Sequence, residues 1–409
     1  MRRLVVRRLL ELGLLVTLVA CGPPADPPPP FAEWSATHPR PEGFVLLGED
    51  TREAADNGSL TLAFELPEGA TSIEINAATR SDLYLQVTSI RSPTGEVHVP
   101  LEDATFSDPR SYVTEAFLEA HQAQNPTIPR RGSAGFRFPN DAFTTLQPGA
   151  WSVTVTSFDV DLVRDPEFRV LSARRQRVSD TLHVKAFART GAIEEGVIDL
   201  HVLLGPGTGF SAATAPSDEV MASALAVIDR VYSRQNVRVR DIFFEDVPSF
   251  PTRAALVPET CDPSEVVRDI AGQASVRPGY IPIAMIGGFL CQVRSAGGQI
   301  TNQGQGIGGF SPGIPGVFST EGEALVVSTE LLRRFPDIWS VVLAHEVGHF
   351  LGLMHTVQLG LNLDDNLVDT EGDNNNIMHP AAYEIFAPFL TDMQGTVIRQ
   401  SPYVQPVTP

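Results

Sequence analysis

The sequence predicts a multidomain α+β protein with an all-β N-terminal half and an α/β C-terminal half, behind an export segment. At 409 residues the chain exceeds one ordinary globular core. Short alternating apolar runs fill residues 45–190, whereas helical spacing and continuous apolar runs begin after residue 195. We therefore expect four segments: 1–21, 22–44, 45–190 and 195–402.

The first segment, residues 1–21, is typical of a targeting signal. Arginines precede an apolar run at 9–20, which is too short to span a bilayer as a mature helix. The run ends Leu18-Val19-Ala20-Cys21, which resembles a bacterial lipoprotein signal that leaves Cys21 to be acylated. An ordinary secretory signal is the alternative. Either predicts export, and the first predicts an outer-membrane or cell-surface lipoprotein that touches the membrane only through Cys21.

The net charge limits the class of binding partner, and the cysteine content bears on a possible disulfide. A net charge of -19 argues against nucleic acid, because a phosphate-binding protein needs a basic patch. Export places Cys261 and Cys291 in an oxidising setting, where a disulfide between them would persist. Two separate buried thiols are the alternative, since the sequence does not give their geometry.

The N-terminal half combines a proline-rich tether, residues 22–44, with a predicted β-sandwich at 45–190. Alternating runs at 60–66, 83–90 and 151–158 predict strands, and residues 113–122 predict a helical insertion. Residues 146–155 resemble the end of the jelly-roll accessory domains found beside secreted peptidases. A basic cluster at 173–177 predicts a solvated loop or strand face, or else a cleavage site that would remove this half as a prodomain.

The C-terminal half predicts helices packed on a sheet. Strands are expected at 197–204, 237–244, 281–286 and 324–328, and a helix at 217–235. Residues 306–316 are rich in glycine and predict either an edge strand that a substrate could pair with or a flexible loop. A second helix is expected to begin at Pro336-Asp337, with Asp337 as N-cap.

That second helix carries three chemically distinctive side chains. His345 and His349 are four apart, so their imidazoles share one helix face and can bind one metal ion. Glu346 lies to the side, where a carboxylate can act as general base without being a ligand.

A third histidine requires the helix to end. In a continuous helix His355 would stand about 15 Å along the axis from His345, too far to share a metal. Gly352 is placed to break the helix, because glycine adopts positive φ without steric cost. His355 then returns to complete three protein ligands for Zn²⁺ and leaves one coordination position open for water.

The spacing of His345, Glu346, His349, Gly352 and His355 resembles the extended motif of the metzincin zinc metalloproteases. The resemblance covers residues 195–402 and is closest to the pappalysin-like branch. It implies a mixed sheet, an active-site helix, a small C-terminal subdomain that closes with a helix at 391–399, and a methionine turn at Met378. Relatives place a tyrosine two positions after that methionine. Here Pro380 stands there, and Tyr383 is the candidate assisting phenol.

Two other hypotheses for metal binding concern the acidic residues that follow His355 in the chain. A thermolysin-like site would use a glutamate, Glu371 or Glu384, as third ligand, but His355 fits better. Hard oxygen ligands for Ca²⁺ are available, although a solvated loop is an equal alternative; the candidates are Asp364, Asp365, Asp369 and Asp373.

These observations together predict a secreted or surface-anchored zinc endopeptidase acting on protein or peptide substrates. The resemblance implies that zinc polarises the scissile carbonyl while Glu346 moves the proton. The alternative is a surface lipoprotein that binds protein or glycan through the β-sandwich, with a non-catalytic zinc domain. The open coordination position disfavours it, because structural zinc sites close all four positions with protein ligands.

Overall fold

The computed structural model describes residues 43–81, 83–99, 130–164, 170–256, 269–270, 273, 277–290, 292–294, 300–302, 308–311, 324–358, 363–365, 367–370, 375–380 and 387–407. Several predictions fall outside the described residues: the signal with Cys21, the tether, the insertion at 113–122, Cys261, Cys291, Glu371, Asp373, Tyr383 and Glu384. Within the described part, no helix is long and apolar enough to cross a membrane.

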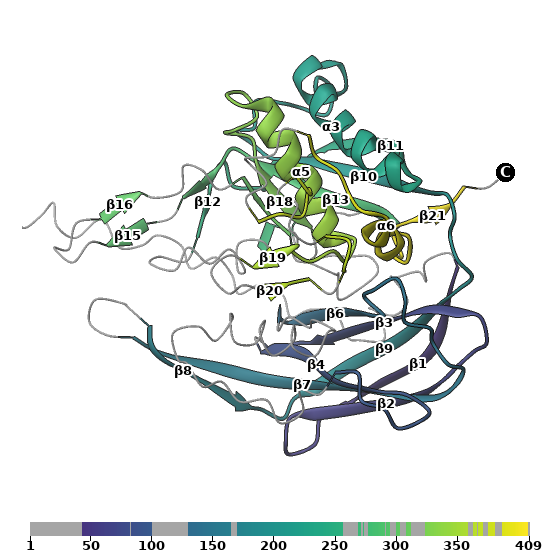
Figure 1. Cartoon of the computed structure of the whole chain (residues 1–409). Helices are drawn as coiled ribbons and strands as arrows, with labels where there is room; N and C mark the ends of the chain where they lie inside the picture. Colours follow the sequence, from purple (N-terminus) through teal and green to yellow (C-terminus); the bar gives the residue numbers. More distant parts are fainter. Residues whose placement is uncertain are drawn as a thin grey trace, which may run out of the picture.

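The N-terminal half consists of two antiparallel sheets, which form the lower two layers in Figure 1. The first has the order β1-β9-β3-β6, with β1 at Phe44–Glu53, β9 at Thr181–Thr190, β3 at Ala70–Thr79 and β6 at Ser133–Phe138. The second has the order β2-β7-β4-β5, and β8 pairs with β7. Its strands are β2 (Ser59–Leu66), β7 (Gly149–Arg164), β4 (Tyr84–Arg91), β5 (Arg130–Arg131) and β8 (Val170–Arg177).

Alternation along these strands builds one apolar core from both sheets. Leu60, Leu62 and Phe64 of β2 share a buried cluster with Ile73 and Ile75 of β3. This is the period-2 pattern from which the strands were expected. The basic cluster at 173–177 lies within β8, hydrogen-bonded to β7, and is therefore part of a sheet instead of a linker between the halves.

The C-terminal half is built on a mixed sheet of order β11-β10-β13-β18-β17, as predicted. The four strands β11 (Val237–Asp246), β10 (Gly196–Leu204), β13 (Tyr280–Ile286) and β18 (Leu325–Ser328) run parallel. The edge strand β17 (Gly309–Phe310) is antiparallel to β18, and β21 (Gln405–Pro406) pairs with β10. Three short pairs complete the strands: β12 (Ala254–Ala255) with β14 (Phe289–Leu290), β15 (Gln292–Arg294) with β16 (Ile300–Asn302), and β19 (Val357–Gln358) with β20 (Leu363–Asp364).

Three helices of this half position the site. Helices α3 (Glu219–Tyr232) and α5 (Pro336–Phe350) pack against each other and share one apolar core with strands β10, β13 and β18. Asp218 caps α3 by accepting from the N–H groups of Val220 and Met221, at 3.0 and 2.9 Å. The closing helix α6 (Asp392–Arg399) occupies the expected range, and Thr391 is its N-cap.

The start of α5 differs from the prediction. The N-cap is Phe335, Pro336 is the first helical residue, and Asp337 lies inside the first turn. Proline suits that position because its missing N–H has no partner there anyway. The predicted capping role of Asp337 was therefore wrong, although its carboxylate still lies at the end of the helix dipole that favours negative charge.

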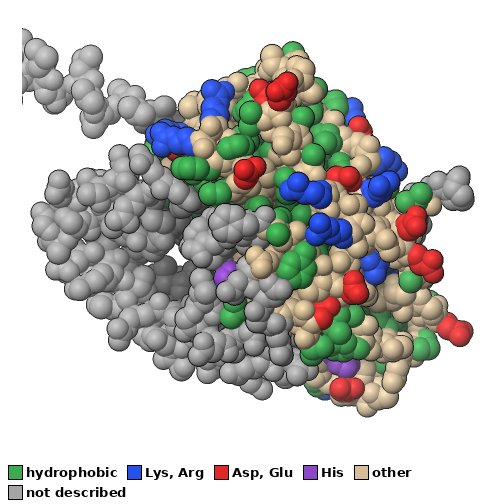
Figure 2. Space-filling model, turned by 45° about the horizontal axis from the view of Figure 1, so that its top comes forward, with side chains coloured by type: hydrophobic (Ala, Val, Ile, Leu, Met, Phe, Trp, Pro, Cys, Tyr) green, Lys and Arg blue, Asp and Glu red, His purple; other side chains and the backbone are tan. Residues whose placement is uncertain are grey.

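The visible surface carries both signs of charge. On the face drawn in Figure 2, basic and acidic side chains are interspersed and hydrophobic ones are scattered between them. Such a mixture produces no extended field of one sign on this face.

Candidate metal centre

Helix α5 is held on several sides by buried neighbours. Trp339, Leu343, Ala344, Val347 and Phe350 have exposed fractions of 0%. The indole of Trp339 donates to the Ser328 carbonyl at the end of β18, at 2.6 Å. A helix buried this completely has no freedom to slide or rotate, so the side chains that it carries are fixed in position.

Helix α5 ends in a Schellman turn centred on Gly352. Leu351 is the C-cap, and Gly352 has a φ of 103°, in the region that favours glycine. The N–H of Gly352 donates to the His349 carbonyl at 3.0 Å, and the N–H of Leu353 donates to the Gly348 carbonyl at 2.9 Å. The expected helix break therefore occurs at Gly352, and it redirects the chain toward His355.

Backbone carbonyls orient the two helical imidazoles. His345 Nδ1 lies 2.7 Å from the Ile377 carbonyl, and His349 Nδ1 lies 2.8 Å from the Leu353 carbonyl. A carbonyl can only accept, so both Nδ1 atoms carry the proton and both Nε2 atoms carry a lone pair. A second hydrogen bond of this kind is what fixes the tautomer and ring direction of metal-binding histidines.

The three Nε2 atoms converge on one point. His345 Nε2 lies 3.0 Å from His349 Nε2 and 3.2 Å from His355 Nε2. Nitrogens bound tetrahedrally to zinc would be about 3.4 Å apart, given a Zn–N distance near 2.1 Å. The lone pairs of His345 and His349 would repel at this separation without a cation between them. The donor set and spacing therefore fit Zn²⁺.

Burial keeps these imidazoles neutral. Burial, together with the neighbouring His355, lowers the pKa of His345 to about 4. Burial, followed by the adjacent His345, lowers the pKa of His349 well below its usual value. A metal ligand must be unprotonated, so these shifts favour metal binding.

Met378 forms a packed support under α5. It is fully buried, and a Cβ added to Gly348 would lie 2.4 Å from its sulfur. Gly348 therefore has a packing task that the sequence motif did not reveal. The turn is anchored by Asn376, whose amide donates to Gln394 of α6 at 2.8 Å and whose oxygen accepts from the Met378 N–H at 2.9 Å.

Glu346 lies beside the edge strand. Its exposed fraction is 8%, and burial raises its pKa to about 8, opposed by a hydrogen bond from the backbone of Ser311. A Cβ added to Gly309 of β17 would lie 3.0 Å from Glu346 Cγ. The glycines of this segment thus allow the edge strand to approach the carboxylate closely.

The calcium hypothesis finds no support in the described residues. Among them the only cluster of potential metal ligands is His345, His349 and His355. Asp365 accepts hydrogen bonds from the Leu367 N–H and the Thr370 hydroxyl, and Asp369 accepts from Thr391 and Met393 near the start of α6. These carboxylates fix local structure. Asp364 lies in β20, where only the backbone is described, so its candidacy is not tested.

The comparison with protein families decides the class. The Peptidase_M43 family, described as Pregnancy-associated plasma protein-A, matches residues 321–401, which contain α5, all three histidines, Met378 and α6. Over these residues the chain is similar to metzincin-like zinc metallopeptidases. The resemblance to the pappalysin-like branch is confirmed over these residues, which form the last part of the range 195–402 expected from the sequence.

Two further comparisons concern the chain as a whole. No curated protein matches the chain. Among solved structures, metalloproteinase-II from Bacteroides fragilis is similar at 14% identity and a TM-score of 0.32, covering 53% of this chain and 62% of that one. The chain thus spans less than two thirds of the length of that structure.

Proposed function

We propose that the protein is an exported zinc endopeptidase that hydrolyses peptide bonds in protein or peptide substrates. The observation that carries the proposal is the convergence of three Nε2 atoms beside a buried carboxylate. The histidines supply three ligands only, which is typical of catalytic zinc sites, since structural sites use four protein ligands.

The residues divide the chemistry between them. His345, His349 and His355 would hold the zinc, which supplies a Lewis acid that polarises a carbonyl and acidifies water. Glu346 would take a proton on its carboxylate and return it to the leaving amine. Burial raises the pKa of Glu346, which favours its holding the proton between the two transfers. The Ser311 backbone hydrogen bond would fix the orientation of that carboxylate.

The edge strand β17 suggests how a substrate is held. Its residues pair with β18 on one side, and it is the last strand in the sheet order. The backbone of an extended peptide can add to such an edge by hydrogen bonding. Because β17 passes beside Glu346, a peptide added there would run past the carboxylate. Endopeptidase activity follows if the peptide can extend beyond the site in both directions.

Export and anchoring are proposed from the N-terminal sequence. The apolar run at 9–20 ending at Cys21 supports a lipoprotein signal, and the tether at 22–44 would space the folded part from the membrane. The two N-terminal sheets would then form a β-sandwich accessory domain. Incorporation of labelled palmitate into the full chain, and its loss in Cys21→Ser, tests the anchor. Equal labelling of both chains would contradict it.

Glu346→Gln tests the catalytic proposal. The variant should keep one zinc per chain by elemental analysis and cleave casein roughly a hundredfold to ten-thousandfold more slowly, the usual contribution of a general base. Glu219→Gln is the matched control, because Glu219 is an exposed residue in the first turn of α3. Cleavage by Glu346→Gln at the control rate would refute the assignment.

A further inference from the structure

The outer face of the first N-terminal sheet is polar but buried. Along β3, β6 and β9 the side chains of Glu74, Arg137 and Arg189 alternate with residues of the apolar core, so they point away from that core. Their exposed fractions are nevertheless only 0%, 0% and 2%. The C-terminal half supplies the cover, and the contacts of its described residues with this face include hydrogen bonds to the two arginines.

Arg137 links the two halves at the turn that ends α5. It pairs with Glu74, its neighbour across the sheet, through Nε at 2.9 Å. Its Nη1 donates to the Leu351 carbonyl at 2.8 Å and approaches the Val397 carbonyl of α6 at 3.4 Å. Leu351 is the C-cap of α5. A cation from the N-terminal half therefore satisfies a carbonyl at the negative end of the active-site helix.

Arg189 repeats this arrangement at the end of α6. Its Nη2 donates to the carbonyls of Ser401 and Val404 at 2.7 and 3.0 Å, and its Nε donates to Gln400 at 3.3 Å. Burial and the nearby Arg137 lower the pKa of Arg189 to about 10. Two cations are thus held together in the interface, where the carbonyls of the C-terminal half complement their charge.

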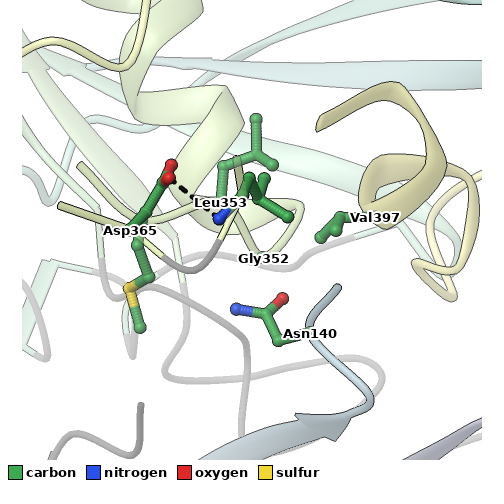
Figure 3. Close-up of a pocket in the computed structure, with 7 residues that line it drawn as sticks. Asn140, Gly352, Leu353, Asp365 and Val397 are labelled. Atoms are coloured by element: carbon green, nitrogen blue, oxygen red, sulfur yellow. Dashed lines mark hydrogen bonds between the residues drawn. The ribbon is translucent and has the colours of Figure 1, made fainter. Parts of the chain in front are cut away.

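The turn held by Arg137 also orients a metal ligand. Leu351 is followed by Gly352 at positive φ and by Leu353, whose carbonyl fixes His349 Nδ1. Figure 3 places Gly352, Leu353 and Val397 around one small cavity, with Asn140 reaching it from the end of β6 in the N-terminal half. A shift of Leu351 would therefore move the carbonyl that sets the direction of His349.

We propose that the N-terminal half is a permanent structural part of the metal site, with Arg137 as a positioning residue for the turn after α5. This inference rests on the proposed zinc site. It separates an integral accessory domain from the alternative, a prodomain that leaves after cleavage.

The first test measures zinc affinity in the full chain. Replacing both members of the pair, as in Glu74→Met with Arg137→Met, avoids leaving a lone buried charge and is the variant expected to fold. Its zinc affinity, from competition with a chromophoric chelator, should be about tenfold weaker than that of the unmodified protein, as when a supporting partner of a ligand is lost. Near-UV circular dichroism establishes that the variant is folded.

Two further variants control this measurement. Arg52→Met is the matched control, because Arg52 is half-exposed on β1 and donates to Thr61 within the N-terminal half; its zinc affinity should be unchanged. Arg137→Lys, which keeps the charge, should recover part of the affinity. A folded double variant that binds zinc as tightly as the Arg52 control overturns the proposal. Failure of the unmodified protein to bind zinc would instead refute the proposed function.

The second test asks whether the halves can part. The connection at 191–195 is mostly exposed, so a specific protease site inserted there can be cut in the folded protein. After the cut, the two pieces should elute together in size-exclusion chromatography with zinc bound. Separation of the pieces with zinc retained on the C-terminal piece alone overturns the proposal.

Discussion

The two halves of the chain each bury a cluster of polar side chains, and the clusters differ in how their hydrogen-bonding groups are matched. On the outer face of the N-terminal sheet, Arg137 and Arg189 donate to a carboxylate and to backbone carbonyls. In the C-terminal half, the Nε2 lone pairs of His345 and His349 face each other at 3.0 Å. The first cluster contains donors and acceptors together, whereas these two facing atoms are both acceptors.

This difference separates a structural from a functional polar cluster. Buried polar groups are normally matched within the protein, because an unmatched one costs free energy. A site at which acceptors converge requires a ligand that is a cation. The same criterion argues against calcium at Asp369, where protein donors reach both carboxylate oxygens.

Removal of one of the converging histidines should have the largest effect, on zinc binding and on cleavage. His349→Ala leaves two ligands and should weaken zinc binding by roughly a hundredfold or more, beyond the cost of losing a supporting partner, and abolish cleavage of casein. Chelator competition gives the affinity. His98→Ala in the N-terminal half is the control, and comparable zinc binding in both variants would contradict the convergence argument.

Removal of Arg137 from its pair with Glu74 should have the second largest effect, on the free energy of unfolding. Arg137→Met alone leaves the buried Glu74 carboxylate without its guanidinium, and should destabilise the fold by about 3 to 5 kcal/mol in urea unfolding. The double variant with Glu74→Met should recover most of that loss, because no buried charge remains. Equal destabilisation of single and double variants would show that the pair is not matched as described.

The pH dependence of stability tests a third buried polar group. His183 of β9 accepts or donates a hydrogen bond with Thr51, and burial, followed by the charge of Lys185, lowers its pKa to about 4, although Glu49 acts in the opposite direction. The unfolded state therefore binds more protons than the folded state between pH 6.5 and 4. The contribution of His183 to the free energy of unfolding is thus fully present above pH 6.5 and is lost as the pH falls toward 4. The decline should amount to about 2 kcal/mol after allowance for solvent screening.

His183→Gln isolates this contribution. Urea unfolding of both chains across pH 4 to 7 should give a shallower pH dependence for the variant, and the difference removes titrations that the two chains share. Parallel curves would contradict the assigned shift.

Gly352→Ala should have the smallest effect on stability. An L-residue in the left-handed region costs about 1 to 2 kcal/mol, and here the strain should also weaken zinc binding, because the turn orients His349 and delivers His355. Gly69→Ala is the control, with a φ of 77° in the N-terminal half and open space around the added Cβ. Both variants should lose stability, while only Gly352→Ala should lose zinc affinity.

Local patterns account for most of what the sequence predicted correctly. The fixed pitch of a helix places His345 and His349 on one face, and the conformational freedom of glycine places the break at Gly352. Alternation and helical spacing likewise predicted β2, β4, much of β7 and helix α3, whereas α6 was implied by the family resemblance. The N-cap of α5 was missed, because Pro336 begins the helix one residue before Asp337.

Contacts between segments distant in the chain were beyond the sequence. The carbonyls of Ile377 and Leu353 belong to the backbone, which is the same at every residue, so no residue type identifies them as partners of the imidazoles. The close packing of Gly348 against Met378 and the approach of Gly309 to Glu346 also depend on how separate elements pack.

The sequence by itself predicted the cluster of three histidines, the candidate general base Glu346 and the break in the helix, because these depend on spacings of a few residues and on side-chain chemistry. Only the tertiary structure decided the tautomers of the histidines, the role of Asp365 and Asp369, and the burial of Arg137 against Leu351. The His345 tautomer and the contact of Arg137 arise where segments 32 and 214 residues apart meet, and their energies depend on distance and burial, which no local pattern encodes.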